Sequence, residues 1–181
     1  MLKFTNKILI YFILFIFCSA HSPWSSYLNY RAKHLLIMSV KTDAPTYPFS
    51  ELLIKYINKE LPEAQSKPAR AKDFERVQSL FSTNQMPLVL LSKQNAKDLI
   101  NGEGEFKEFG STDANVLYGF GDLILLIQPS LPNRHAWLLL NALKKSKSVF
   151  KDGISPDKLA DIGEPHPGAI MALNGEEMPD S

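Results

Sequence analysis

HLLIMSV, residues 34–40, is the stretch that decides the fold of this chain. This compact apolar run has the length of a β-strand and is typical of a strand that is buried in a sheet. The next residues, 41–48, are polar and include Asp43, Pro45 and Pro48, which favour a loop. An amphipathic segment follows this loop, so the opening residues predict a buried strand that leads into a helix.

Strands and helices alternate outward from this strand as far as residue 92. We expect, in order, a helix over residues 50–61 that Ser50 caps, a polar strand over residues 65–71, a helix that Asp73 caps, and a buried strand over residues 86–91. Such alternation requires crossover connections between strands. The sequence therefore predicts an α/β fold, with a mainly parallel sheet and helices on both faces.

The remaining residues extend the same domain. We expect a short helix over residues 95–100, strands over residues 115–120 and 123–128 around a turn at Gly121-Asp122, a helix from Asn133 to about Val149, and a short helix over residues 169–173. The predicted organisation is a signal peptide at residues 1–20, an arm at 21–33, a single α/β domain at 34–175 and a flexible tail at 176–181.

Residues 1–20 are typical of a secretory signal peptide. A short basic segment precedes an unbroken apolar run at residues 8–17, and small residues follow it. The run is shorter than the roughly 20 residues that span a bilayer. We expect cleavage after Ala20 and a periplasmic location. Lipid anchoring at Cys18 is a less favoured alternative because bulky Phe17 precedes it, and an uncleaved anchor is another.

Composition and charge exclude several functional classes. The chain carries 20 Lys+Arg and 19 Asp+Glu, a formal net charge of +1, which argues against a nucleic-acid partner. The only cysteine, Cys18, lies in the predicted leader, so the mature chain has no thiolate nucleophile. The sequence contains no nucleotide-binding fingerprint, no nucleophile elbow and no histidines at metal-ligand spacing. We therefore expect no cofactor, no metal site and no enzymatic activity.

The candidate ligand-binding residues follow two of the predicted strands. They are Lys41, Thr42, Thr46, Tyr47, Ser92 and Asn95. In parallel sheets, ligands gather beyond the carboxyl ends of strands, where loops and helix N-termini offer free N–H groups. Lys41 can pair with an anion, the two threonines can hydrogen-bond it, and Tyr47 can stack on it. The alternative is an ordinary polar loop in which Tyr47 packs against the sheet.

Four further features occur in a fixed order along the chain. They are a strand and loop that lead to Thr46-Tyr47-Pro48, a strand and helix that end in Asn101-Gly-Glu-Gly-Glu-Phe106, the strand pair within residues 115–128, and His166-Pro-Gly-Ala169 at the start of a short helix. Together they resemble the periplasmic solute-binding proteins of TRAP transporters of the TAXI type.

The resemblance implies one lobe of a type II periplasmic-binding-protein-like fold. Family members are about twice as long and close two α/β lobes on a ligand, whereas here Gln128 leads almost directly into the helix at Asn133. The implied function is to bind a small anionic or amino-acid-like ligand, with TRAP membrane subunits as partners. The alternative is a non-enzymatic interaction protein, whose open face forms a homodimer or docks on a protein partner.

Overall fold

The computed structural model describes residues 33–43 and 46–180. Residues 34–181 make up one unit of the chain, and the description below concerns that unit. The predicted signal peptide lies outside the described residues, and so does the predicted arm except for Lys33. None of the helices in the described part has the length and apolar character that crossing a bilayer requires.

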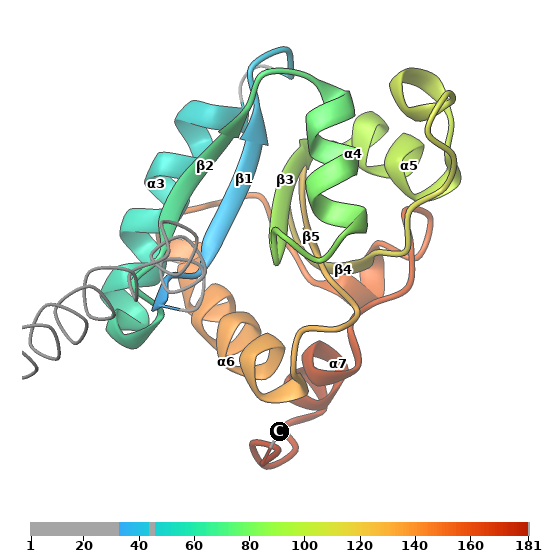
Figure 1. Cartoon of the computed structure of the whole chain (residues 1–181). Coiled ribbons are helices and arrows are strands. Elements are labelled where there is room, and N and C mark those ends of the chain that lie inside the picture. Colours follow the sequence, from blue (N-terminus) through green and yellow to red (C-terminus); the bar gives the residue numbers. More distant parts are fainter. Residues whose placement is uncertain (1–32, 44–45, 181) are drawn as a thin grey trace, which may run out of the picture. The chain divides into compact units, whose positions relative to one another are not determined.

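A six-stranded mixed sheet forms the centre of this unit (Figure 1). Its strands are β1 (Leu36–Val40), β2 (Lys67–Ala71), β3 (Leu88–Ser92), β4 (Asn115–Phe120), β5 (Leu123–Ile127) and β6 (Gly153–Ile154), in the spatial order β2-β1-β3-β5-β4-β6. β1 pairs in parallel with β2 and with β3, whereas the β3–β5, β4–β5 and β4–β6 pairs are antiparallel. The predicted α/β class is confirmed.

The sheet is less parallel than the sequence predicted, and β5 is the main reason. The two residues between β4 and β5 form a tight turn, and such a turn joins only antiparallel strands. β5 then lies between β3 and β4, so it makes both of its neighbouring pairs antiparallel. Among the named strands of the described part, parallel pairs occur in the β2-β1-β3 part, where helices supply the crossover connections.

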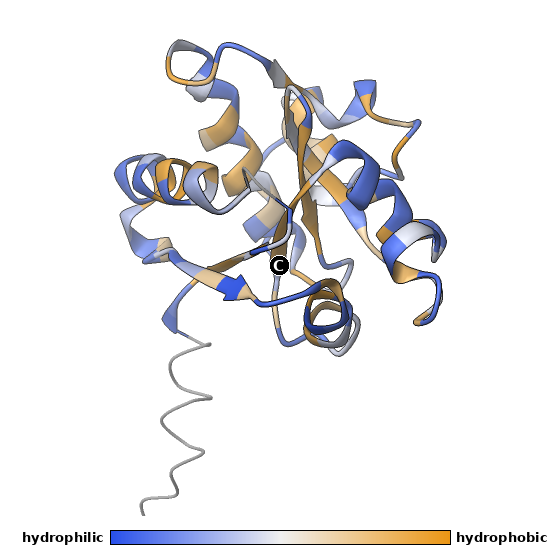
Figure 2. Ribbon diagram, turned by 90° about the horizontal axis from the view of Figure 1, so that it is seen from above, coloured by the Kyte–Doolittle hydropathy of each residue, from blue (hydrophilic) through white to orange (hydrophobic). Residues whose placement is uncertain are grey.

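Five α-helices cover the two faces of the sheet in the described part. They are α3 (Thr46–Glu60), α4 (Phe74–Ser82), α5 (Lys93–Asn101), α6 (Asn133–Lys144) and α7 (Pro167–Asn174). Short 3-10 turns occupy Pro62–Ala64, Gly104–Phe106, Lys145–Ser148 and Pro156–Lys158. α3, α6 and α7 pack on one face and α4 and α5 on the other, each around its own apolar cluster. Figure 2 shows hydrophobic residues concentrated in the central strands, between helices of mixed character.

α4 illustrates how the sequence specifies these elements. The Asp73 carboxylate accepts a hydrogen bond from the Arg76 N–H at 2.9 Å, so the predicted cap is confirmed. Val77, Leu80 and Phe81 are buried against the sheet, at the helical spacing that the sequence showed. Burying each such side chain contributes about 1.5–3 kcal/mol, so packing rather than helix propensity holds α4 in place.

The predicted boundaries of α3 and α6 are wrong. α3 begins at Thr46 rather than beyond Ser50, whose buried hydroxyl donates to the Tyr47 carbonyl at 2.7 Å. Pro48 lies in the first turn, where a helix needs no N–H donor, so it does not mark the loop that the sequence suggested. Asn133 is the first residue of α6 and not a cap, and α6 ends at Lys144, where a 3-10 turn replaces it.

The His-Pro-Gly-Ala stretch packs α7 against α6. The Gly168 N–H donates to Nδ1 of the His166 ring at 3.1 Å, and Nε2 of that ring lies 3.1 Å from the Leu131 carbonyl oxygen. Burial lowers the pKa of His166, although its hydrogen bonds to backbone carbonyls oppose this effect. A Cβ atom on Gly168 would lie 2.2 Å from the Asn133 carbonyl oxygen, so only glycine allows the two helices to approach so closely.

Candidate functional site

The carboxyl ends of β1 and β3 form the edge at which the predicted site residues lie. Lys41 and Thr42 are exposed directly after β1, and Ser92 and Asn95 are half-buried where β3 passes into α5. The Asp43 carboxylate accepts a hydrogen bond from the Ser92 N–H at 2.8 Å. This bond joins the loop after β1 to the start of α5, so the structure brings the two predicted halves of the site together.

Thr46 is part of the scaffold at this edge. Its side chain is fully buried, and its hydroxyl lies within hydrogen-bond distance of the Asp43 carbonyl oxygen, at 2.6 Å, and of the Val40 carbonyl oxygen, at 3.2 Å. Its N–H also donates to the Asp43 carbonyl at 3.0 Å. These bonds fold the loop back on itself at the start of α3, and they turn the Thr46 hydroxyl away from any ligand at the surface.

Tyr47 lies beside a cation that the sequence analysis did not single out. The guanidinium carbon of Arg70 lies 4.3 Å from the centre of the Tyr47 ring, a cation–π distance. Arg70 is exposed near the end of β2, opposite Ser39 of β1. One signal in the sequence could have found it: if the polar strand runs parallel beside the first strand, its last residues reach the same edge. Tyr47 therefore has a cationic partner within this domain, and its predicted stacking on a ligand stays a prediction.

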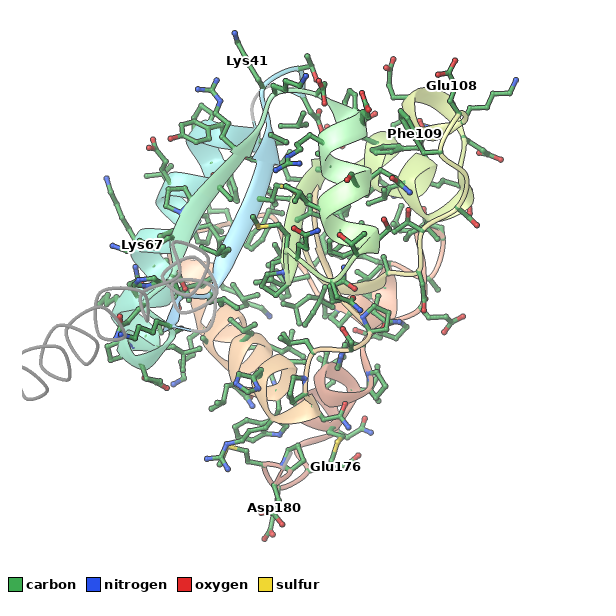
Figure 3. All side chains as sticks on the ribbon, in the orientation of Figure 1. Lys41, Lys67, Glu108, Phe109, Glu176 and Asp180 are labelled. Carbon is green, nitrogen blue, oxygen red and sulfur yellow. The ribbon has the colours of Figure 1, made fainter. Side chains whose placement is uncertain are left out.

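Two exposed cations lie at this edge, together with the buried carboxylate of Asp43, which accepts the Ser92 N–H. Lys41 and Arg70 are both exposed there, and Figure 3 shows Lys41 extending outward from the end of β1. The Ser92 side chain makes no capping hydrogen bond to α5. The N–H groups at the start of a helix carry partial positive charge, but at α5 the Ser92 N–H already bonds the Asp43 carboxylate and the Lys93 N–H bonds the Asp122 carbonyl, so the two cations are the main attraction for an anion. A small carboxylate is the kind of ligand that such an arrangement can hold.

A hollow lies on the face of the sheet that α3 covers. It has a volume of about 600 Å³ and lies between α3 and the segment that follows α6. Its lining residues are Phe49, Leu52, Lys55, Tyr56, Lys59, Phe120, Val149, Phe150, Lys151 and Asp152. None of the predicted site residues lines it. No pattern in the sequence indicates this hollow, because its lining residues come from three segments that only the fold brings together.

The side chains of the described residues form no metal centre. Across residues 33–43 and 46–180, no group of three or more His, Cys, Asp or Glu residues is placed to hold a metal ion. Compared with known protein families and with curated proteins, the chain matches no family model and no curated sequence. The functional interpretation therefore depends on the geometry and chemistry of the chain's own residues.

Proposed function

We propose that this chain is a non-enzymatic binding protein, similar to one lobe of the TAXI-type solute-binding proteins, that holds a small anionic or amino-acid-like ligand. The ligand would lie at the carboxyl edge of β1 and β3. The observation that carries the proposal is the hydrogen bond between the Asp43 carboxylate and the Ser92 N–H, 2.8 Å long. It fixes the polar loop after β1 against the start of α5, so that groups from both elements can contact one ligand.

The cations at this edge support an anionic ligand. Arg70 offers a planar pair of N–H donors that matches a carboxylate, and Lys41 adds a mobile charge. Both are exposed, so the surrounding water and salt weaken their attraction for a ligand. We therefore expect binding to weaken as the salt concentration rises, and to be modest in strength because one lobe leaves part of the ligand in water.

Two features of the architecture support the single-lobe interpretation. β4 and β5 lead back into the sheet as the third family-like feature suggested, and β5 ends shortly before α6. The His-Pro-Gly-Ala stretch opens α7, as the fourth feature suggested. The alternative function, docking of a partner on an open face, remains a prediction. We also propose that this protein is exported to a periplasm.

The test is binding of two small anions to the full chain and to a double variant. L-aspartate and succinate, titrated by calorimetry at low salt, represent an amino-acid-like anion and a simple dicarboxylate. We expect Lys41→Ala with Arg70→Ala to weaken binding about tenfold, because each exposed charge pair contributes up to about 1 kcal/mol and the variant removes two of them. Lys67→Ala is the matched control, since Lys67 is exposed at the opposite end of β2 (Figure 3).

Native mass spectrometry of the chain, recovered from its own cells without denaturation, complements this titration. A small anion that leaves on denaturation, and that is retained by Lys67→Ala but lost from the double variant, supports the proposed site. If the double variant and Lys67→Ala lose the bound anion to the same extent, the anion is held by the general charge of the protein and not by a specific site. Absence of a retained mass, together with no heat of binding for either probe, would contradict a solute-binding function at this edge.

A further inference from the structure

The hollow beside α3, which we call the α3 groove, combines an aromatic floor with exposed aliphatic walls. The rings of Phe49, Phe120 and Phe150 contact one another, with centroids 5.1 Å apart for Phe49–Phe120 and Phe49–Phe150 and 5.3 Å apart for Phe120–Phe150. Leu52 and Val149 line the groove and are 56% and 57% exposed. Exposing large apolar side chains to water is unfavourable, so a ligand that covers Leu52 and Val149 gains free energy of binding.

The floor of the groove is rigidly built. Tyr56 lies beneath it, and its hydroxyl donates to the Ala142 carbonyl of α6 at 3.1 Å. Its ring meets the Phe150 ring edge-on, with centroids 5.7 Å apart. Phe120 and Phe150 are themselves only 6% and 8% exposed, because both belong to the main core on this face of the sheet. The groove is therefore a shaped surface that a ligand can enter without rearranging the fold.

Lysines dominate the charged groups of the groove. Lys55 and Lys59 extend from α3, and Lys151 extends from the opposite wall, all three exposed. Among the described residues none of the three makes an ion pair, whereas Lys72 and Lys93 each pair with an aspartate. Asp152 is the one acidic side chain in the lining. A ligand that enters the groove thus meets apolar rings and an excess of positive charge.

We propose that the α3 groove binds an amphiphilic carboxylate, with its hydrocarbon chain on the aromatic floor and its carboxylate among the three lysines. A volume of about 600 Å³ suits a small molecule rather than a folded domain. Apolar contact supplies the affinity, and the lysines select a negative head group over a neutral or positive one. The proposal uses none of the residues of the carboxyl edge, so it stands or fails independently of the proposed function.

The experiment compares three probes that share one chain length and differ in head-group charge. Decanoate, decanol and decyltrimethylammonium are titrated below their aggregation concentrations into the full chain labelled with ¹³C in its leucine and valine methyl groups. We expect decanoate to shift the methyl signals of Leu52 and Val149 and to bind about fivefold more tightly than decanol, with the cation weakest. The methyl signals of Leu91 and Val89, buried on the other face, serve as internal controls.

Variants separate the role of charge from that of apolar contact. Lys55→Ala with Lys151→Ala should weaken decanoate about fivefold and leave decanol unchanged, because exposed ion pairs are individually weak. Leu52→Ser should weaken the binding of decanoate and decanol alike. Because Leu52 is more than half exposed, we expect the variant to fold, and an unchanged methyl spectrum outside the groove checks this. Lys67→Ala, at the far end of β2, is the control for general charge and should change nothing.

Three results would overturn the proposal. Equal affinity for decanoate and decanol, unaffected by the lysine variants, would remove the selection for a negative head group. Shifts that spare Leu52 and Val149 would place the ligand elsewhere. Shifts of these two methyl signals that follow protein concentration without any probe would show that a second copy of the chain covers the groove.

Discussion

The carboxyl edge and the α3 groove lie in the same unit but use their polar groups in opposite ways. At the edge, the Asp43 carboxylate and the Thr46 hydroxyl make hydrogen bonds to the backbone, so part of what resembles a ligand site is scaffold. In the groove, Lys55, Lys59 and Lys151 make no ion pair among the described residues. A polar residue beyond a strand is thus no evidence of an open site until its hydrogen bonds are known.

At the start of α7, as at the carboxyl edge, the polar groups make hydrogen bonds within the fold. His166 and Gly168, which the resemblance marked, are both buried and serve the packing of α7 on α6. Substituting a residue that is buried or hydrogen-bonded within the fold should lower the free energy of unfolding. Substituting an exposed residue of the groove should lower ligand affinity only. The following predictions test that division, from the largest expected effect to the smallest.

Gly168→Ala should have the largest effect. The added methyl group would lie 2.2 Å from the Asn133 carbonyl oxygen, and backbone must move to admit it, so we expect a loss of about 3 kcal/mol in the free energy of unfolding. Urea unfolding measures this loss. Gly175→Ala, at the other end of α7, is the control: nothing lies within 4 Å of its added methyl group, and only its positive φ of 73° opposes the change. A smaller loss at Gly168 than at Gly175 would contradict close packing of α6 and α7.

Asp43→Ala should destabilise the chain by about 2 kcal/mol, because it leaves the Ser92 N–H without its acceptor and breaks the link between the loop after β1 and the start of α5. Asp43→Asn keeps an oxygen that can accept the same bond and should recover most of the loss. Urea unfolding gives the stabilities, and hydrogen exchange of the Ser92 amide reports the bond itself. Unchanged exchange of that amide in Asp43→Ala would show that the bond does not hold the edge together.

Acid should weaken the fold through His166. Burial lowers the pKa of this imidazole in the folded state, so the unfolded chain takes up a proton first as the pH falls below the usual histidine value of about 6.5. The stabilising contribution of the neutral ring is complete above that pH and declines below it. We expect stability to fall as the pH drops below about 6.5, the value at which the unfolded chain takes up the proton. His166→Asn, which keeps an acceptor for the Gly168 N–H but does not titrate, should be less stable at neutral pH and show a flatter decline.

Leu52→Ser and Val149→Ser should change stability least, by less than about 0.5 kcal/mol each, because both side chains are more than half exposed. Thermal and urea unfolding are the measurements, with Leu53→Ser, next in the chain but fully buried, as the contrasting variant. A loss above 1 kcal/mol at Leu52 or Val149, roughly that of a core residue, would mean that another part of the chain already covers the groove.

The sequence predicted those features of the fold that depend on local pattern. Apolar runs located the strands, and Asp73 marked the start of α4 as a helix cap should. Features that depend on spatial neighbours were missed. Pro48 resembled a loop residue because nothing local shows that it lies in a first helical turn. The insertion of β5 between β3 and β4 follows from sheet pairing, which periodicity does not encode.

The same distinction, between local pattern and spatial neighbours, applies to the candidate site. Lys41 and Thr42 could be placed at a strand end from the sequence, because the strand itself was predicted. The sequence could not predict that Thr46 is buried, because this depends on how the loop folds back. It could not predict that Arg70 lies beside Tyr47, because this depends on which strand lies next to β1. The α3 groove was beyond prediction, because Phe49, Phe120 and Phe150 are far apart in the chain and meet only in the folded core.

An NMR titration with two ligands tests most directly whether the chain has two separate binding sites. L-aspartate and decanoate are added in turn to the full chain, labelled with ¹⁵N and with ¹³C methyl groups, and both signal sets are followed. We predict that L-aspartate shifts the amides of Lys41, Thr42, Ser92 and Asn95, and that decanoate shifts the methyl groups of Leu52 and Val149. If both compounds shift one common set of signals, or if L-aspartate moves none of the edge amides, the separation of the two sites is wrong.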